Sequence, residues 1–269
     1  MNNENDLIAN KWEKYEKQGL KFFTIWDFPE RDPLNIVPYR IKGSCPVSIP
    51  LQCIIRYSKK GELVLDPFCG SGTTLIACSF LERKGVAIEL NGKIIEIANQ
   101  NLNHFAKKYP ENKWSSQQKI IQGDSIVYMK DYIKKNTIDL VFAHPPYWNL
   151  IDYSQYYSQV NDDLSSLKSF NEFLIKVDVM FKGIYKILRK DRYACILIGD
   201  VFPNEKMTIP LDFYFTEVAL KNNFQFINKI IKITHNSSSK NRGFENIKFR
   251  SIKSNFIICN HDYLLIFRK

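Results

Sequence analysis

The sequence of 269 residues lacks several features that would place it in other classes. No apolar run approaches the roughly 20 residues that a membrane-spanning helix needs. The first residues, Met-Asn-Asn-Glu-Asn-Asp, are polar and acidic, which is not the pattern of a secretory signal. None of the six cysteines stands in a Cys-x-x-Cys pair, so neither zinc nor another metal is expected. We therefore expect a cytoplasmic protein with reduced thiols.

Acidic residues are also in short supply, because 28 Asp and Glu face 38 Lys and Arg and leave a net charge of +10. Such a balance favours a polyanionic partner over an acidic small molecule. The excess is greatest between residues 229 and 256, where seven basic residues accompany one acid, Glu245. A charge run can be no more than a solvated face. The alternative is a nucleic-acid contact, for which we single out Lys240, Arg242, Lys248 and Arg250.

A glycine turn stands at residues 66–74, which read Asp-Pro-Phe-Cys-Gly-Ser-Gly-Thr-Thr. It follows a short apolar run at 63–65 and opens a helical pattern at 73–81. Such a turn lets backbone N–H groups at a helix start approach a ligand closely. A phosphate loop would need lysine where Thr73 stands, so ATP or GTP hydrolysis is disfavoured. A dinucleotide-binding turn would need glycine where Leu75 stands.

The pattern then alternates between short apolar strands and helical runs, which predicts a doubly wound α/β fold with a parallel sheet. A proline-rich segment at 22–50 predicts an extended strap, and an amphipathic helix is expected at 5–20. The predicted strands are 63–65, 85–88, 120–121, 140–142, 194–198, 226–233 and 263–267, of which the last two form a closing hairpin. The predicted helices are 46–58, 73–81, 93–107, 126–134 and 170–188.

A second motif, His-Pro-Pro-Tyr-Trp, occupies residues 144–148. Together with residues 66–74, it resembles the paired signature of the S-adenosylmethionine-dependent DNA amino-methyltransferases, which methylate N4 of cytosine or N6 of adenine. The resemblance covers the chain from about residue 39 to the C-terminus. It implies a seven-stranded, mostly parallel, Rossmann-like methyltransferase sheet with an antiparallel last strand, and S-adenosylmethionine as the cofactor.

In doubly wound sheets, ligands bind beyond the carboxyl ends of the strands, and four predicted strands end at the residues that the resemblance singles out. The resemblance implies that Glu89 accepts hydrogen bonds from the ribose hydroxyls of the methyl donor, S-adenosylmethionine. It also implies that Asp124 accepts a hydrogen bond from the adenine amine of this donor. An acid such as Asp124 can also be only a helix cap. The expected donor site comprises Asp66, Pro67, Phe68, Gly70, Gly72, Thr73, Glu89, Asp124 and Ser125.

The second motif is expected to hold the acceptor. An aryl amine is a poor nucleophile, and a site activates it by accepting hydrogen bonds from its N–H groups. The Pro145 carbonyl, fixed by two prolines, is one such acceptor, and Tyr147 is expected to stack on the base. The expected catalytic residues are His144, Pro145, Pro146 and Tyr147.

His144 departs from the family pattern, which has Ser or Thr in cytosine enzymes and Asp or Asn in adenine enzymes. A histidine accepts a hydrogen bond only when neutral, so methyl transfer should fall as the pH drops through an imidazole pKa of about 6.5. Alternatively, His144 orients the loop while Pro145 polarises the amine. Trp148 favours cytosine.

A tyrosine-rich segment follows Trp148 and is expected to close over a flipped base. Its candidate contacts are Tyr153, Tyr156 and Tyr157, and Trp148 and Tyr153 are predicted to bind the substrate. Asp200, His235 and His261 are weaker candidates.

We therefore divide the chain into an N-terminal helix and strap at 1–50 and a methyltransferase domain at 51–269, with inserted loops at 149–168 and 234–256. The predicted function is site-specific DNA methylation of a flipped base, with cytosine-N4 favoured over adenine-N6, in a restriction-modification system or as a stand-alone modifier. Expected partners are double-stranded DNA and either a second copy or a cognate endonuclease. The alternatives are an RNA guanine-amine methyltransferase and a non-catalytic donor-binding specificity partner.

Overall fold

The computed structural model describes residues 19–32, 34–148, 167, 169–204, 207–235, 251–253, 255 and 257–269. Several expectations fall outside these ranges. They are the helix at 5–20 except its last two residues, the substrate contact Tyr153 with most of the loop at 149–168, and the basic residues Lys240, Arg242, Lys248 and Arg250.

The centre of the fold is an eight-stranded sheet in the order β1-β9-β10-β6-β5-β2-β3-β4. Its strands are β1 (Ile25–Trp26), β2 (Leu63–Asp66), β3 (Lys84–Glu89), β4 (Gln118–Gln122), β5 (Ile138–Ala143), β6 (Leu188–Ile198), β9 (Gln225–Ile233) and β10 (His261–Arg268). β10 runs antiparallel to both neighbours, and the other pairs are parallel. The expected doubly wound fold is thus confirmed, with one strand more than the expected seven.

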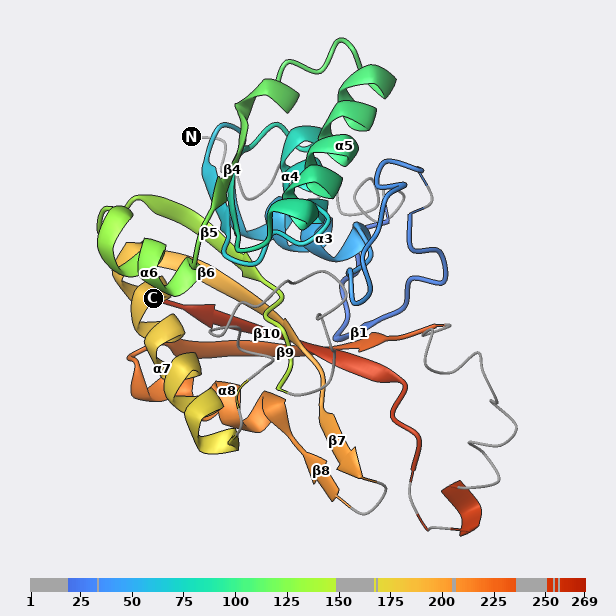
Figure 1. The fold of residues 1–269 in the computed structure, drawn as a ribbon, viewed down its shortest axis with the longest axis vertical. Helices are drawn as coiled ribbons and strands as arrows, with labels where there is room; N and C mark the ends of the chain where they lie inside the picture. The colour runs from blue at the N-terminus through green and yellow to red at the C-terminus, as the bar shows by residue number, and fades with distance from the viewer. Residues whose placement is uncertain are drawn as a thin grey trace, which may run out of the picture.

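Helices cover both faces of this sheet, with α3, α4 and α5 on one side and α7 and α8 on the other (Figure 1). Their bounds are α3 (Ser48–Tyr57), α4 (Thr73–Phe80), α5 (Gly92–Lys108), α7 (Phe170–Ile187) and α8 (Leu211–Lys221). A Ser169–Glu172 capping box starts α7.

Two apolar layers pack against the sheet because side chains alternate along each strand. In β5, Val141 and Ala143 point into the layer that α7 and α8 cover, whereas Leu140 and Phe142 point into the layer of α3 and α4. All four are fully buried. A strand buried on both faces reads as a continuous apolar run, which is why the sequence predicts β5 well.

The extra strand, β1, belongs to the segment expected as an extended strap. It pairs with β9 in parallel, and the Ile231 N–H donates to the Thr24 carbonyl at 2.8 Å. Trp26 is buried in the layer of α3 and α4. These contacts bring the strap onto the sheet, while the division of the chain at residue 50 stays a prediction.

Three further elements differ from expectation. The helix expected at 126–134 is a short α-helix, α6 (Ser125–Val127), followed by a π-helical turn, η2 (Tyr128–Tyr132). Between β6 and β9 the structure adds a small hairpin, β7 (Val201–Asn204) and β8 (Met207–Ile209), and then α8.

Within the described ranges, no helix is both long and apolar enough to span a bilayer.

Candidate active site

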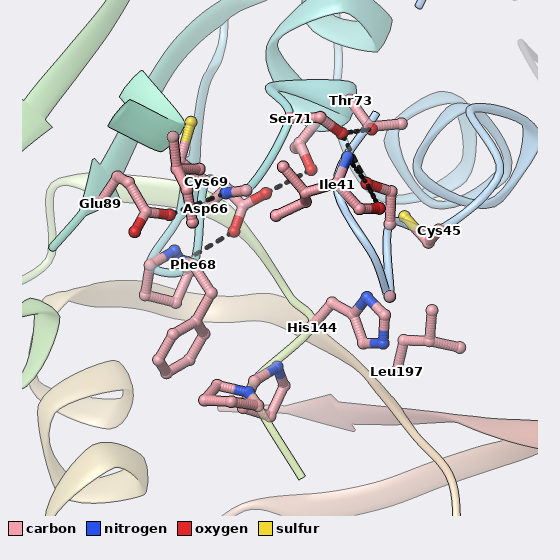
Figure 2. Close-up of a pocket in the computed structure, with 18 of the residues that line it drawn as sticks. Ile41, Cys45, Asp66, Phe68, Cys69, Ser71, Thr73, Glu89, His144 and Leu197 are labelled. Carbon is pink, nitrogen blue, oxygen red and sulfur yellow. Dashed lines mark hydrogen bonds between the residues drawn. The ribbon is translucent and has the colours of Figure 1, made fainter. Parts of the chain in front are cut away.

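A cavity of about 430 Å³ opens at the carboxyl ends of β2, β3 and β5 (Figure 2). This volume lies within the usual range of small-ligand sites, about 300–1,000 Å³. β2 and β5 are neighbours in the sheet, as the resemblance implied. The cavity collects most of the expected site residues, namely Asp66, Pro67, Phe68, Gly70, Thr73, Glu89, Asp124, Ser125, His144, Pro145, Pro146 and Tyr147.

Asp66 closes β2 and organises the glycine turn. Its Oδ1 accepts from the Phe68 N–H at 2.9 Å, and its Oδ2 accepts from the Thr74 hydroxyl at 2.5 Å. Burial outweighs these hydrogen bonds and raises the pKa of Asp66 to about 6. The carboxylate is therefore committed to holding the turn in shape rather than to reaching across the cavity.

Glu89 ends β3 and reaches back to the same turn. Its Oε2 accepts from the Gly70 N–H at 3.0 Å, and its Oε1 accepts from the Asn91 N–H at 3.1 Å. Burial raises the pKa of Glu89 above its ordinary value. A carboxylate has about four acceptor positions, so these backbone hydrogen bonds leave room for a ligand hydroxyl.

Asp124 and Gly72, which the sequence predicts to bind S-adenosylmethionine, each also have a structural role. Asp124 caps α6, and its Oδ1 accepts from the Ile126 N–H at 2.7 Å while the side chain still lines the cavity. Gly72 caps α4 with φ 78° and faces α5, where an added Cβ would lie 3.2 Å from Ala98 Cβ. Gly72 is not among the lining residues of the cavity, so its place in the structure is a close helix contact.

Asn101, which sequence reasoning missed, ties the turn to the strap. This fully buried residue of α5 donates from Nδ2 to the carbonyls of Tyr39 and Ser71, both at 2.7 Å. It also accepts from the Tyr39 N–H at 3.0 Å. An asparagine on the buried face of an amphipathic helix is the one sequence signal that could have revealed it.

The second motif leaves β5 directly into the cavity. His144 Nε2 lies 3.1 Å from the Tyr147 hydroxyl, so a hydrogen bond joins the two residues that flank Pro145 and Pro146. Burial lowers the pKa of His144 to about 4, and the imidazole is therefore neutral at physiological pH. Tyr147 is only 9% exposed and packs into the apolar layer of α7 and α8.

Trp148 turns away from this loop. Its Nε1–H donates to the Leu167 carbonyl at 3.0 Å, and its ring packs edge-on against Phe170 at 5.4 Å between centroids. Trp148 does not line the cavity. Its predicted contact with the substrate stays a prediction.

A buried polar group on β9 and β10, which the sequence analysis did not single out, completes the wall of the cavity. Lys232 and Asp262 stand opposite each other in the strand register, and Lys232 Nζ lies 2.7 Å from Asp262 Oδ2. Thr234 donates to the same oxygen at 2.8 Å. Burial tends to raise the pKa of Asp262, but the charge and hydrogen bond of Lys232 prevail and hold it below its usual range.

The sequence did carry a signal for this group. Ile230 and Leu264 belong to the apolar layer of α3 and α4, and the next same-face positions toward the cavity are Lys232 and Asp262. Thus β9 and β10 each change from an apolar to a charged residue at paired positions, Lys232 and Asp262. The pattern is recognisable only once the register of the hairpin is known.

The cavity therefore has two ends (Figure 2). At one end Glu89 offers carboxylate oxygens and the glycine turn offers a close backbone approach, which fits the ribose and amino-acid parts of a nucleoside donor such as S-adenosylmethionine. At the other end His144, Pro145 and Asp262 offer acceptors for a second, polar ligand. In the described part of the chain, no three His, Cys, Asp or Glu side chains are grouped to hold a metal ion.

Two family models match the sequence. The model described as DNA methylase matches residues 2–100, and the one described as Conserved hypothetical protein 95 matches residues 52–174. The first match contains the glycine turn and Glu89. The second contains both cavity motifs.

Curated relatives match over short segments. The chain is 40% identical to the Type II methyltransferase M.HpaI of Haemophilus parainfluenzae over 86 residues, which are 32% of this chain and 27% of that protein. It is 26% identical over 112 residues to a tRNA (guanine(10)-N2)-dimethyltransferase of Methanothermobacter thermautotrophicus, covering 41% of this chain and 30% of the relative. The chain thus spans less than a third of the length of either relative.

The fold also has counterparts among solved structures. The precorrin-6y C5,15-methyltransferase of Geobacter metallireducens GS-15 aligns with a TM-score of 0.52 at 12% identity, covering 86% of this chain and 92% of that one. This likeness concerns the fold alone. Over residues 2–100, which include the glycine turn of the cavity, the chain is similar to the proteins described as DNA methylase.

Proposed function

We propose that the protein transfers a methyl group from S-adenosylmethionine to the exocyclic amine of a DNA base that is flipped out of its duplex. Cytosine N4 is the favoured acceptor and adenine N6 the alternative. The observation that carries the proposal is that one cavity is lined both by the Asp66–Thr73 turn with Glu89 and by the Pro145 loop.

The donor end is assigned to Gly70, Glu89 and Asp124, which line the same cavity. Glu89 would accept from the ribose hydroxyls, Asp124 would accept from the adenine amine through Oδ2, and the turn at Gly70 would approach the amino-acid part. When bound, S-adenosylmethionine supplies an electrophilic methyl group on its sulfonium. Asp66 and Asn101 act indirectly, because their hydrogen bonds hold the turn.

At the acceptor end, the Pro145 carbonyl accepts one N–H of the amine and draws the nitrogen toward tetrahedral geometry. Two prolines fix this carbonyl before the substrate arrives, so little reorganisation is needed. The His144–Tyr147 contact holds the loop at both ends. A flipped base also needs an aromatic surface to replace lost stacking, a role that we assign to Tyr147.

The test is mass spectrometry of nucleosides from the DNA of a methylation-deficient host that expresses the protein, with Pro145→Ala as the matched variant. N4-methylcytosine or N6-methyladenine should appear with the wild type and be lost or strongly reduced with the variant. Soluble wild-type protein that binds the donor but leaves the DNA unmodified would refute the proposal.

One observation favours a second candidate, methylation of a guanine amine in RNA. It is the match to a tRNA dimethyltransferase over 41% of this chain. The same chemistry would apply, because the acceptor is again an exocyclic amine. N2-methylguanosine in RNA from the expressing host, together with unmodified DNA, would favour this candidate.

Binding of DNA is assigned to Lys240, Arg242, Lys248 and Arg250, in the basic segment between 229 and 256. If Lys240, Arg242, Lys248 and Arg250 contact phosphates, DNA affinity should fall steeply with salt. Replacing all four by Gln should lower both the affinity and the slope of its logarithm against the logarithm of salt concentration. A second copy or a cognate endonuclease as partner, a restriction-modification role and a cytoplasmic location belong to the same proposal; the described cysteines are free thiols, which suits a reducing compartment.

A further inference from the structure

The Lys232–Asp262 pair is unusual in its position. Lys232 is 6% exposed, and the pair faces the cavity that contains His144 and Pro145 rather than the solvent. Replacing a buried ion pair by well-packed apolar side chains is often neutral or stabilising, so fold stability alone gives little reason for these charges. The neighbouring same-face positions, Ile230 and Leu264, are apolar and fully or almost fully buried.

The carboxylate of Asp262 is held through one oxygen. Oδ2 accepts from Lys232 Nζ at 2.7 Å and from the Thr234 hydroxyl at 2.8 Å, and Lys232 Nζ also lies 2.9 Å from Thr234 Oγ1. This closed triangle fixes the direction of the carboxylate. Lys232 and Asp262 are paired in the hairpin of β9 and β10, and Thr234 follows directly after β9.

The other oxygen points toward the motif loop. A Cβ added at Gly199 would lie 2.7 Å from Asp262 Oδ1 and 3.1 Å from Tyr147 Cε2, so the oxygen and the tyrosine ring both lie close to Gly199. His144 interacts electrostatically with Asp262 across the same space. Oδ1 thus lies near Gly199 and the Tyr147 ring, and Asp262, His144 and Tyr147 all line the cavity.

The chemistry of the amine calls for an acceptor at this place. An exocyclic amine has two N–H groups, and the Pro145 carbonyl serves one. His144 has one ring nitrogen engaged with the Tyr147 hydroxyl. An ionised carboxylate is an acceptor only, and its hydrogen bonds are stronger than those between neutral groups.

We propose that Asp262, through Oδ1, accepts the second N–H of the amine that receives the methyl group, and that Lys232 and Thr234 are its positioning residues. This rests on the proposed function. The amine lone pair forms the new N–C bond while the S–C bond breaks and leaves its electron pair on sulfur. The methylated amine then carries one proton too many, and Asp262 Oδ1 takes that proton. A protonated aryl amine is a strong acid, so even a carboxylate of low pKa can accept the proton.

The test compares Asp262→Asn with wild type in single-turnover methyl transfer to genomic DNA from a methylation-deficient host, with labelled S-adenosylmethionine and excess protein. Donor affinity is measured in parallel by calorimetry. We expect the transfer rate to fall at least 100-fold while the donor dissociation constant changes less than threefold. Thr234→Val, which removes one hydrogen bond to Oδ2, should lower the rate about tenfold and serves if Asp262→Asn does not fold. Asp212→Asn is the matched control. Asp212 pairs at 3.1 Å with Lys229, which belongs to β9 like Lys232, but this pair does not line the cavity, so Asp212→Asn should keep the wild-type rate.

Three results would overturn the inference. Wild-type transfer by Asp262→Asn would remove Asp262 from the reaction and leave the proposed function intact. A loss of donor affinity that matches the loss of rate would assign Asp262 to the donor or to the fold. A wild-type protein that binds the donor and methylates no nucleic acid would refute the proposed function and this inference together.

Discussion

The Gly70 N–H donates to Glu89 Oε2 at 3.0 Å, which joins the turn after β2 to the end of β3. If Glu89 also accepts from the ribose of the donor, Glu89→Gln should weaken S-adenosylmethionine binding about 10- to 100-fold, since a hydrogen bond to a charged group contributes about 1.5–3 kcal/mol. Calorimetry would measure this. Glu96→Gln, which changes an exposed carboxylate on α5, is the control. Equal affinities of Glu89→Gln and wild type would exclude the ribose contact.

The pH dependence of transfer distinguishes the structure from the simplest sequence-based expectation. Because the pKa of His144 is lowered to about 4, its imidazole stays neutral from pH 8 to pH 5 and can accept or orient throughout. The ratio of the wild-type rate to that of His144→Asn should therefore be constant over this range in single-turnover assays. A ratio that falls below pH 6.5 would mean that His144 titrates at its ordinary pKa. Asp66, with a pKa of about 6, titrates in both proteins, so taking the ratio of the two rates removes its effect on the pH dependence.

The strands were predictable where both their faces are buried. β2, β3 and β5 read as short apolar runs, and a helical pattern follows β2 and β3 in turn. β1 was not predictable, because it has two residues in a segment full of prolines and exists only through its pairing with β9. The region of β7, β8 and α8 has no comparable periodic pattern, and its apolar residues, such as Phe213 and Leu211, are divided between surface and core.

The site was predictable to the extent that it follows local sequence. Asp66 and Glu89 are the last residues of β2 and β3, Pro145 follows β5 by two residues, and the carboxyl ends of these strands meet at one edge of the sheet. Lys232 and Asp262 are 30 residues apart and become neighbours only through the register of β9 and β10. Neither hydrophobic pattern nor motif spacing specifies that register.

Asp139 offers a test of stability that leaves the cavity alone. It lies near the start of β5, at the edge of the sheet opposite the cavity, is 3% exposed, and accepts from the Leu63 N–H at 2.9 Å and from Arg189 Nη1 at 2.6 Å. Asp139→Ala should lower the free energy of unfolding by about 3 kcal/mol, because it leaves a buried donor and a cation without their partner. Glu217→Ala breaks an exposed pair with Lys221 on α8 and should cost about 0.5 kcal/mol. Urea unfolding would measure both. Donor affinity should be unchanged, and a loss of it in folded Asp139→Ala would contradict the separation of the two edges.

Gly199 tests the geometry between Asp262 and Tyr147 without removing either side chain. An alanine Cβ there would lie 2.7 Å from Asp262 Oδ1, closer than van der Waals contact allows, so the carboxylate or the Tyr147 ring must move. Overpacking of this kind costs about 1–3 kcal/mol of stability. Because Lys232 and Thr234 hold Oδ2, the groups that move are Asp262 Oδ1 and the Tyr147 ring, which we assign to the acceptor. Gly199→Ala should therefore lower the rate of methyl transfer about tenfold or more and leave the affinity for S-adenosylmethionine unchanged. Gly92→Ala is the matched control, since its Cβ would meet Gln122 at an ordinary 3.5 Å. If folded Gly199→Ala transferred methyl groups as fast as wild type, the positions of Asp262 Oδ1 and the Tyr147 ring would not matter to the reaction, and the acceptor end would have to be sought elsewhere in the cavity.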